Sequence, residues 1–167
     1  DLGVHAHMAD RLGIMYAAGG QGIARGEAEA AKWSRKAADQ GHAGAPSALG
    51  FLYGNGQGVA KDETEAVRWY RKAAAQGNPR AQDNLGLAYA QGQGVVRDEA
   101  EAVRWFRQAA DQGFAKSQFM LFIAYVHGRG VTRDESEAAR WLRKAADQGV
   151  GVAQFNMGIA YARGQGV

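Results

Sequence analysis

Amide and basic side chains return at equivalent places along this chain, and they are the groups suited to gripping a peptide. Arg80 and Lys116 lie 36 residues apart, and Asn84 and Asn156 share one position of the same period. An asparagine amide offers both a hydrogen-bond donor and an acceptor to a peptide bond. A basic side chain adds charge-assisted hydrogen bonds to a carboxylate. The set predicts polar contacts to a bound peptide, with ordinary polar lining of a groove as the alternative.

An apolar cluster interrupts this pattern in the second half of the chain. Phe122 stands at the position that glycine holds at Gly50 and Gly86, and Phe119 and Met120 adjoin it. A phenylalanine at a close helix contact pushes the helices apart or rotates outward, and overpacking costs about 1–3 kcal/mol. Two interpretations stay open. One is a local repacking of the core, and the other is an apolar pocket with these side chains as anchors for a partner.

Patterns for other chemistry are missing. The chain has no cysteine, which removes disulfides and thiolate metal sites. None of its serines is followed three residues later by lysine, as a nucleophile and base of the β-lactamase kind require. The glycine-rich segments, such as 54–58, lack the Gly-Lys-Ser/Thr ending of a phosphate loop and are predicted to be turns. The histidines form no converging ligand set. We therefore expect no catalytic residue, no metal and no cofactor. The histidines are His5, His7, His42 and His127.

The elements that position these side chains follow a repeat of 36 residues. A period of about 20–50 residues marks a stack of similar small units, none of which can bury its apolar face alone. The tryptophans keep this interval at Trp33, Trp69, Trp105 and Trp141. The glycines keep it at Gly41, Gly77, Gly113 and Gly149.

Each repeat is predicted to form two helices joined by a turn. In the third repeat, an apolar stripe predicts a helix at about 80–91. The glycines that follow it break the helix. A second helix is expected to open at Asp98, where Glu101 completes a capping-box pattern, and to end at Gly113. Gly86 is expected to let the two helices approach closely.

These residues together resemble the Sel1-like repeat (SLR) family, which is related to the tetratricopeptide repeat. The resemblance rests on Leu85-Gly86-x-x-Tyr89, the glycine-valine turn, Asp98, Ala102, Trp105 and Ala109-Ala110. It implies an all-α fold, a right-handed α/α superhelical solenoid of helix-turn-helix repeats whose first helices line the concave face. The expected single domain has four full units and a terminal half unit. Their boundaries are about 5–43, 44–79, 80–115, 116–151 and 152–167.

The charge pattern bears on partners and compartment. The net charge is +3, but in each unit acids precede bases along the second helix, as the helix dipole favours. This order is typical of a solvated helix face, and we expect no nucleic-acid partner. No apolar run is long enough for membrane insertion, and no signal peptide is present. The chain starts and stops in mid-pattern, as a mature or excised segment does, and a soluble protein of the bacterial cytoplasm or periplasm is expected.

The resemblance implies a non-enzymatic protein–protein interaction scaffold, or adaptor, that binds a partner peptide or helix on its concave face. In tetratricopeptide relatives, Asn with Lys or Arg on successive first helices grips an extended peptide, and the position of Phe119 points inward. Asp10, Ser47, Asp83 and Phe155 share that position. The implied contact residues are Arg80, Asn84, Lys116, Phe119, Met120, Phe122 and Asn156.

The alternative function is self-assembly. The helix expected at about 152–163 has no second helix after it, so its side with Phe155 and Ile159 lacks the polar cap that a solenoid end requires. Another unit or domain of the intact protein would cover that side, or a homo-oligomer formed through this terminal half unit would do so instead.

Overall fold

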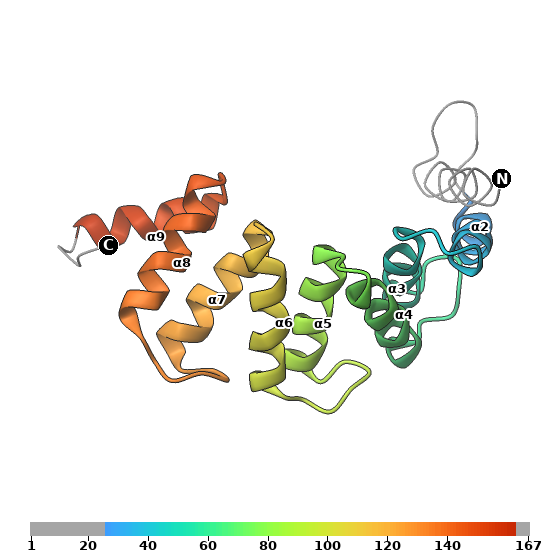
Figure 1. Cartoon of the computed structure of the whole chain (residues 1–167), viewed down its shortest axis with the longest axis horizontal. Coiled ribbons are helices and arrows are strands. Elements are labelled where there is room, and N and C mark those ends of the chain that lie inside the picture. Colours follow the sequence, from blue (N-terminus) through green and yellow to red (C-terminus); the bar gives the residue numbers. More distant parts are fainter. Residues whose placement is uncertain (1–25, 163–167) are drawn as a thin grey trace. The chain divides into compact units, whose positions relative to one another are not determined.

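The computed structural model describes residues 26–162, and within this range the protein is built from helices and turns without a strand (Figure 1). The all-α expectation is confirmed, and the helix expected at 80–91 begins one residue earlier. The second helices of the repeats are α2 (Glu27–Asp39), α4 (Glu63–Ala75), α6 (Glu99–Asp111) and α8 (Glu135–Asp147). The first helices are α3 (Ala45–Asn55), α5 (Pro79–Gln91), α7 (Ala115–His127) and α9 (Gly151–Ala162). His5 and His7 lie outside the described residues.

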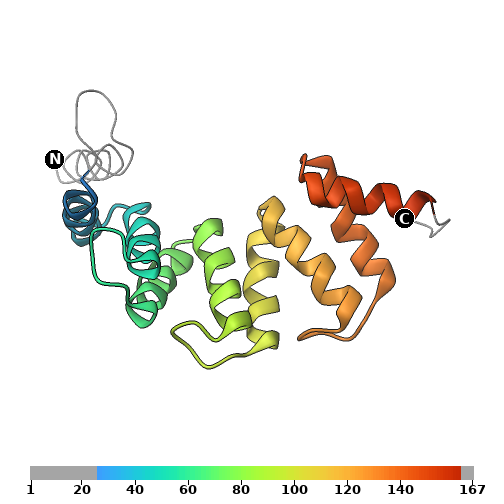
Figure 2. The same ribbon diagram turned by 180° about the vertical axis from the view of Figure 1, so that it is seen from behind.

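The chain packs as two compact parts. The first part contains residues 26–81 with 93–95, and the second contains 82–92 with 96–162. Within each part, helices that follow one another along the chain lie side by side, as both views show for α3 with α4 and for α7 with α8 (Figures 1 and 2).

An aspartate begins each of the second helices after α2. The Asp98 carboxylate accepts a hydrogen bond from the Glu101 backbone N–H at 2.9 Å, as predicted. The reciprocal half of the capping box is not made, because the Glu101 carboxylate pairs with Arg104. The Asp98 backbone N–H instead donates to the Tyr89 carbonyl at 2.9 Å. One residue therefore caps a helix and ties the turn to the helix before it. Asp62 and Asp134 make the same two kinds of contact.

The glycine-rich segments form turns, as predicted. In the first part, Gly94 has a φ of +67°, and a Cβ there would collide with the Glu63 carbonyl at the start of α4. In the second part, Gly130 lies in the same way against Glu99 at the start of α6. Glycine is needed at these positions both for its backbone conformation and because the turn passes directly over a helix end.

A glycine on the first helix faces an aromatic ring on the second helix of the same repeat. A Cβ on Gly50 would lie 2.5 Å from two ring carbons of Tyr70, and a Cβ on Gly86 would overlap the Phe106 ring. We call Gly50–Tyr70 and Gly86–Phe106 the glycine–ring pairs. The close approach expected at Gly86 is therefore made by a side-chain ring rather than by a helix backbone.

The third pair reverses the sizes. Phe122 replaces the glycine, and Leu142 replaces the ring. Phe122 packs against the buried cluster of Leu142, Ala145 and Ala153, and also against the neighbouring cluster that contains Trp141. Bulk has moved from the second helix to the first, so the space is filled without overpacking. This packing supports the core interpretation of Phe122 over the pocket.

Tyr70 makes one of these pairs sensitive to alkaline pH. Burial raises the pKa of its phenol to about 12, against an ordinary value of about 10. The folded chain therefore holds the phenolic proton more tightly than the unfolded chain, and this contribution to stability is lost as pH rises from about 10 to about 12. Tyr70→Phe should flatten the fall in unfolding free energy over that range and change little near neutral pH. Urea unfolding across the range measures this, and equal slopes in the two proteins would contradict it.

Candidate partner-binding surface

The residues predicted to bind a partner lie on the first helices. Lys116 is exposed at the start of α7, and Asn84 and Asn156 are half-buried on α5 and α9 of the same part. Arg80 is exposed but belongs to the first part. The Asn156 side-chain nitrogen donates to the Val152 carbonyl of its own helix at 2.7 Å.

The three predicted apolar anchors are all on α7 and all half-buried. The rings of Phe119 and Phe122 contact each other with centroids 5.6 Å apart, and both pack against the cluster of Leu142, Ala145 and Ala153. Met120 packs against the cluster that contains Trp141. Much of their apolar surface is therefore used within the fold.

The position shared by Ser47, Asp83 and Phe119 does not present free side chains. Ser47 and Asp83 are 7% and 5% exposed, and Phe119 packs toward α8 and α9. The inward orientation taken from the tetratricopeptide relatives does not describe these side chains, because the position faces the neighbouring helices of the stack.

A buried polar pair lies at this position, and the sequence pattern did not predict it. The Ser117 hydroxyl, with no exposed surface, donates to the Asp83 carboxylate at 2.6 Å. Burial raises the pKa of Asp83, while the Ser117 hydrogen bond and the charge of Lys116 oppose that rise. The sequence gives only a weak signal, since this position holds an aspartate in two repeats, Asp10 and Asp83, and serine or phenylalanine in the others.

Asp83→Asn is expected to stabilise the protein near neutral pH by about 1 kcal/mol. A raised carboxyl pKa means that the contribution of Asp83 to folding is present at low pH and lost as pH rises through the folded pKa. Asparagine removes the buried charge and keeps an oxygen that accepts from Ser117. Ser117→Ala, which removes the donor, should have the opposite sign. Thermal unfolding of both variants checks this, and a loss of stability in Asp83→Asn would contradict it.

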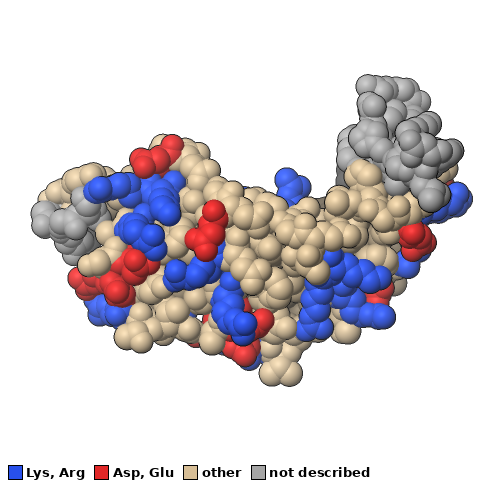
Figure 3. Space-filling view, in the orientation of Figure 1, with Lys and Arg blue, Asp and Glu red and all other residues tan. Residues whose placement is uncertain are grey.

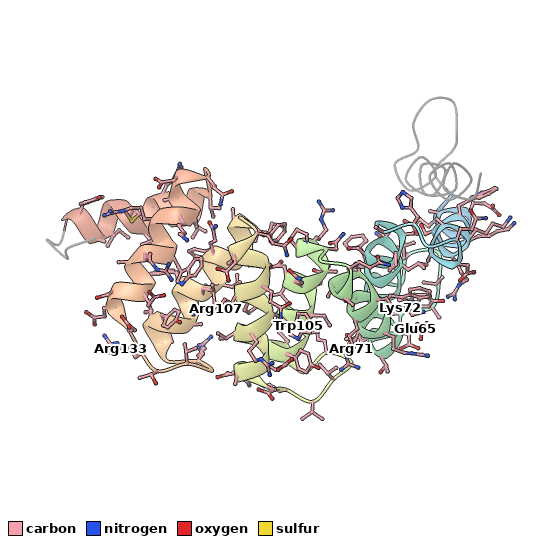
Figure 4. The ribbon with its side chains drawn as sticks, in the orientation of Figure 1. Glu65, Arg71, Lys72, Trp105, Arg107 and Arg133 are labelled. Carbon is pink, nitrogen blue, oxygen red and sulfur yellow. The ribbon has the colours of Figure 1, made fainter. Side chains whose placement is uncertain are left out.

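Arginines at a constant place on the second helices stack between aromatic rings. The Arg107 guanidinium lies 5.8 Å from the ring centroids of both Tyr125 and Trp141, and it donates to the Tyr125 hydroxyl. Figure 4 shows Arg107 projecting from α6 toward α7. In the first part, Arg35 makes the same contacts with Tyr53 and Trp69. Each arginine therefore joins one repeat to both helices of the next.

Other bases of the second helices are also engaged within the fold. The Lys72 ammonium lies 4.1 Å from the Trp69 ring centroid, and Arg104 pairs with Glu101 at 3.1 Å. Acidic side chains lie beside basic ones on the face that Figure 3 shows. The charge pattern predicted a solvated helix face for such bases, but the stacked arginines hold repeats together.

Two further findings concern membranes and metals. Between residues 26 and 162, none of the helices has the length and apolar character that a membrane crossing requires. The same residues contain no group of three His, Asp or Glu side chains placed to hold a metal ion.

Comparison with known proteins gives the family. The Sel1 repeat profile matches residues 6–42, 47–78, 79–114, 115–150 and 151–167. The chain belongs to the Sel1 repeat family. Sel1 repeat proteins are generally protein-interaction scaffolds and are typically non-catalytic. No curated protein matches the chain significantly.

Solved Sel1 repeat structures confirm the solenoid fold class. A protective antigen present in uropathogenic Escherichia coli strains, which displays an SLR fold, has a TM-score of 0.91 and 44% identity over 97% of this chain. A Sel1 repeat protein from Oxalobacter formigenes has a TM-score of 0.91 and 38% identity, again over 97% of this chain. This chain spans 34% of the antigen and 66% of the Oxalobacter protein. The cysteine rich protein B of Helicobacter pylori, at 20% identity and a TM-score of 0.59 over 74% of this chain and 93% of its own, shares the fold.

Proposed function

We propose that this Sel1 repeat chain is a non-enzymatic adaptor that binds a partner peptide or helix through the exposed sides of its first helices. The observation that carries the proposal is that the polar side chains of the first and second helices make different contacts. On the second helices, many of the carboxylates and bases cap helices, pair with one another or stack on rings. The first helices of the second part instead keep Lys116 exposed and Met120 half-buried, with Asn84 and Asn156 on the neighbouring first helices.

These basic, apolar and amide side chains suit a partner segment that offers apolar side chains and carboxylates. Lys116 supplies a charge-assisted hydrogen bond to a carboxylate, and Met120 supplies an adaptable apolar contact. The Asn156 amide nitrogen already donates to its own helix, so it binds a peptide carbonyl only by exchanging that bond. For this reason we rank Lys116 and Met120 above Asn156 as contacts. On the first part, Arg80 by itself offers a charge-assisted hydrogen bond of the same kind.

The test is a selection of peptides that bind the whole chain from a random peptide library, followed by calorimetry with the tightest one. Lys116→Ala and Met120→Ala should each weaken binding about tenfold, as central interface contacts do. Arg104→Ala, on the opposite helix type, is the matched control and should change affinity less than about twofold. Equal affinity in all four proteins, or a loss confined to the Arg104→Ala control, would refute the proposed surface.

A further inference from the structure

The last described helix exposes a face that is buried in the other first helices. Phe155 and Tyr161 of α9 are 69% and 61% exposed. At the position of Phe155, Ser47 and Asp83 are almost fully buried. The exposed positions of α9 are spaced as one helix side, whereas Ala153 and Ala160 are buried on another. The exposed positions of α9 that are buried or half-buried in the other first helices include Gln154, Phe155, Gly158, Tyr161 and Ala162.

The centre of this face is a glycine without its ring. A Cβ on Gly158 would meet no atom within 4 Å among the described residues. Gly50 and Gly86, at the same position of α3 and α5, lie directly under the rings of Tyr70 and Phe106. Gly158 therefore holds the glycine position of a glycine–ring pair, and no ring among the described residues covers it.

The arginine stack at this end is also incomplete. Arg143 holds the position of Arg35 and Arg107 in the repeat and is exposed. In the part of the chain that the structure describes, Arg143 stacks on no ring, while Arg107 lies between a tyrosine and a tryptophan. Tyr161 follows Arg143 by 18 residues, as Tyr125 follows Arg107, so it holds the tyrosine position of such a stack. Arg143 contacts no tryptophan ring among the described residues.

We infer that this α9 face, formed by Phe155, Gly158 and Tyr161, binds the second helix of a further Sel1 repeat, and that it selects a helix in which tryptophan is followed by an aromatic residue. The tryptophan would stack with Arg143 and Tyr161, and the ring after it would cover Gly158. The selection rule comes from the three repeats in which the structure describes both helices. The first repeat has Ser34 after Trp33, and its first helix lies outside the described residues. A glycine on the first helix pairs with Trp69-Tyr70 or Trp105-Phe106, whereas Phe122 pairs with Trp141-Leu142.

A second copy of α9 fits this face less well. α9 has no tryptophan, so a pair of α9 helices would offer Arg143 no indole ring of the kind on which Arg107 stacks. Such a pair is the homo-oligomer expected from the sequence as the alternative, and it is the competing outcome in the test.

The test adds a second helix of this kind to the chain. Residues 163–167 repeat 91–95 at every position except the first, so a copy of residues 96–114 joined after Val167 continues the repeat in register. The extended chain should unfold about 5 °C above the original, with helical circular dichroism increased by the added segment. A matched extension in which the copy of Phe106 is leucine should give less than about half of this rise, because a leucine leaves space over Gly158.

A host with Gly158→Phe checks the selection rule and should reverse it, so that the leucine extension becomes the more stabilising. Equal stabilisation by both extensions in both hosts would overturn the proposed selectivity. An added segment that stays unfolded, or that leaves the unfolding temperature unchanged, would overturn the docking face itself. So would light scattering that shows the original chain to be a dimer which Phe155→Ser dissociates, since α9 would then bind its own copy. Peptide binding at Lys116 is independent of all these outcomes.

Discussion

Phe122→Gly is expected to lower the free energy of unfolding by about 3–5 kcal/mol. The substitution removes a ring that packs against two buried clusters, and it also places glycine inside α7, which adds up to about 1 kcal/mol to the loss. The facing residue, Leu142, is too small to fill the space as Tyr70 and Phe106 do in their pairs. Urea unfolding of the two proteins measures the difference.

Leu142→Phe is the second arm of this experiment. Alone it should destabilise the protein by overpacking, by about 1–3 kcal/mol. Combined with Phe122→Gly, it recreates the Gly86–Phe106 pair and should recover at least half of the loss caused by the glycine, so that the two changes are strongly non-additive. Additive losses would show that Phe122 and Leu142 do not share one space.

Arg107→Ala is expected to lower the free energy of unfolding by about 2–3 kcal/mol. The variant loses the guanidinium between two rings and the hydrogen bond to the Tyr125 hydroxyl, and such contacts each contribute about 1 kcal/mol or more when partly buried. Arg107→Lys should recover less than half, because a planar guanidinium contacts both rings at once and an ammonium does not.

The control for the arginine stack is Arg104→Ala on the exposed side of the same helix. Arg104 pairs with Glu101 one turn away, and an exposed ion pair of this kind contributes less than about 1 kcal/mol. Thermal unfolding of the three variants and the parent separates the effects. A loss in Arg104→Ala as large as that in Arg107→Ala would mean that the stack adds nothing beyond surface charge.

The sequence was sufficient to predict the helices and turns because their signals are local. The aspartate that caps α6 lies three residues before the N–H that it accepts from, and Gly94 needs a backbone conformation that only glycine adopts readily. The 36-residue period then repeats each local signal, so that one correct interpretation holds in every repeat.

The contacts between helices could not be predicted in the same way. Arg104 and Arg107 lie three residues apart on α6, and the sequence does not show which of them stacks on a ring. Only the packing of the folded chain places the Arg107 guanidinium against Trp141. Likewise, Asp83 and Ser117 are far apart in the chain and reveal no pairing by themselves. Contacts of this kind also decide which side chains remain on the candidate surface. Phe119 and Phe122 are half-buried because α7 packs against its neighbouring helices.

The matched sizes across each helix pair bear on how such a gene can gain or lose repeats. A crossover in the loop between α7 and α8 would separate Phe122 from Leu142. A first helix with glycine would then face Leu142 and leave a void, or Phe122 would face an aromatic ring and collide with it. A crossover between whole hairpins keeps every pair intact. Recombination should therefore be tolerated at the ends of the second helices and selected against in the loops that precede them.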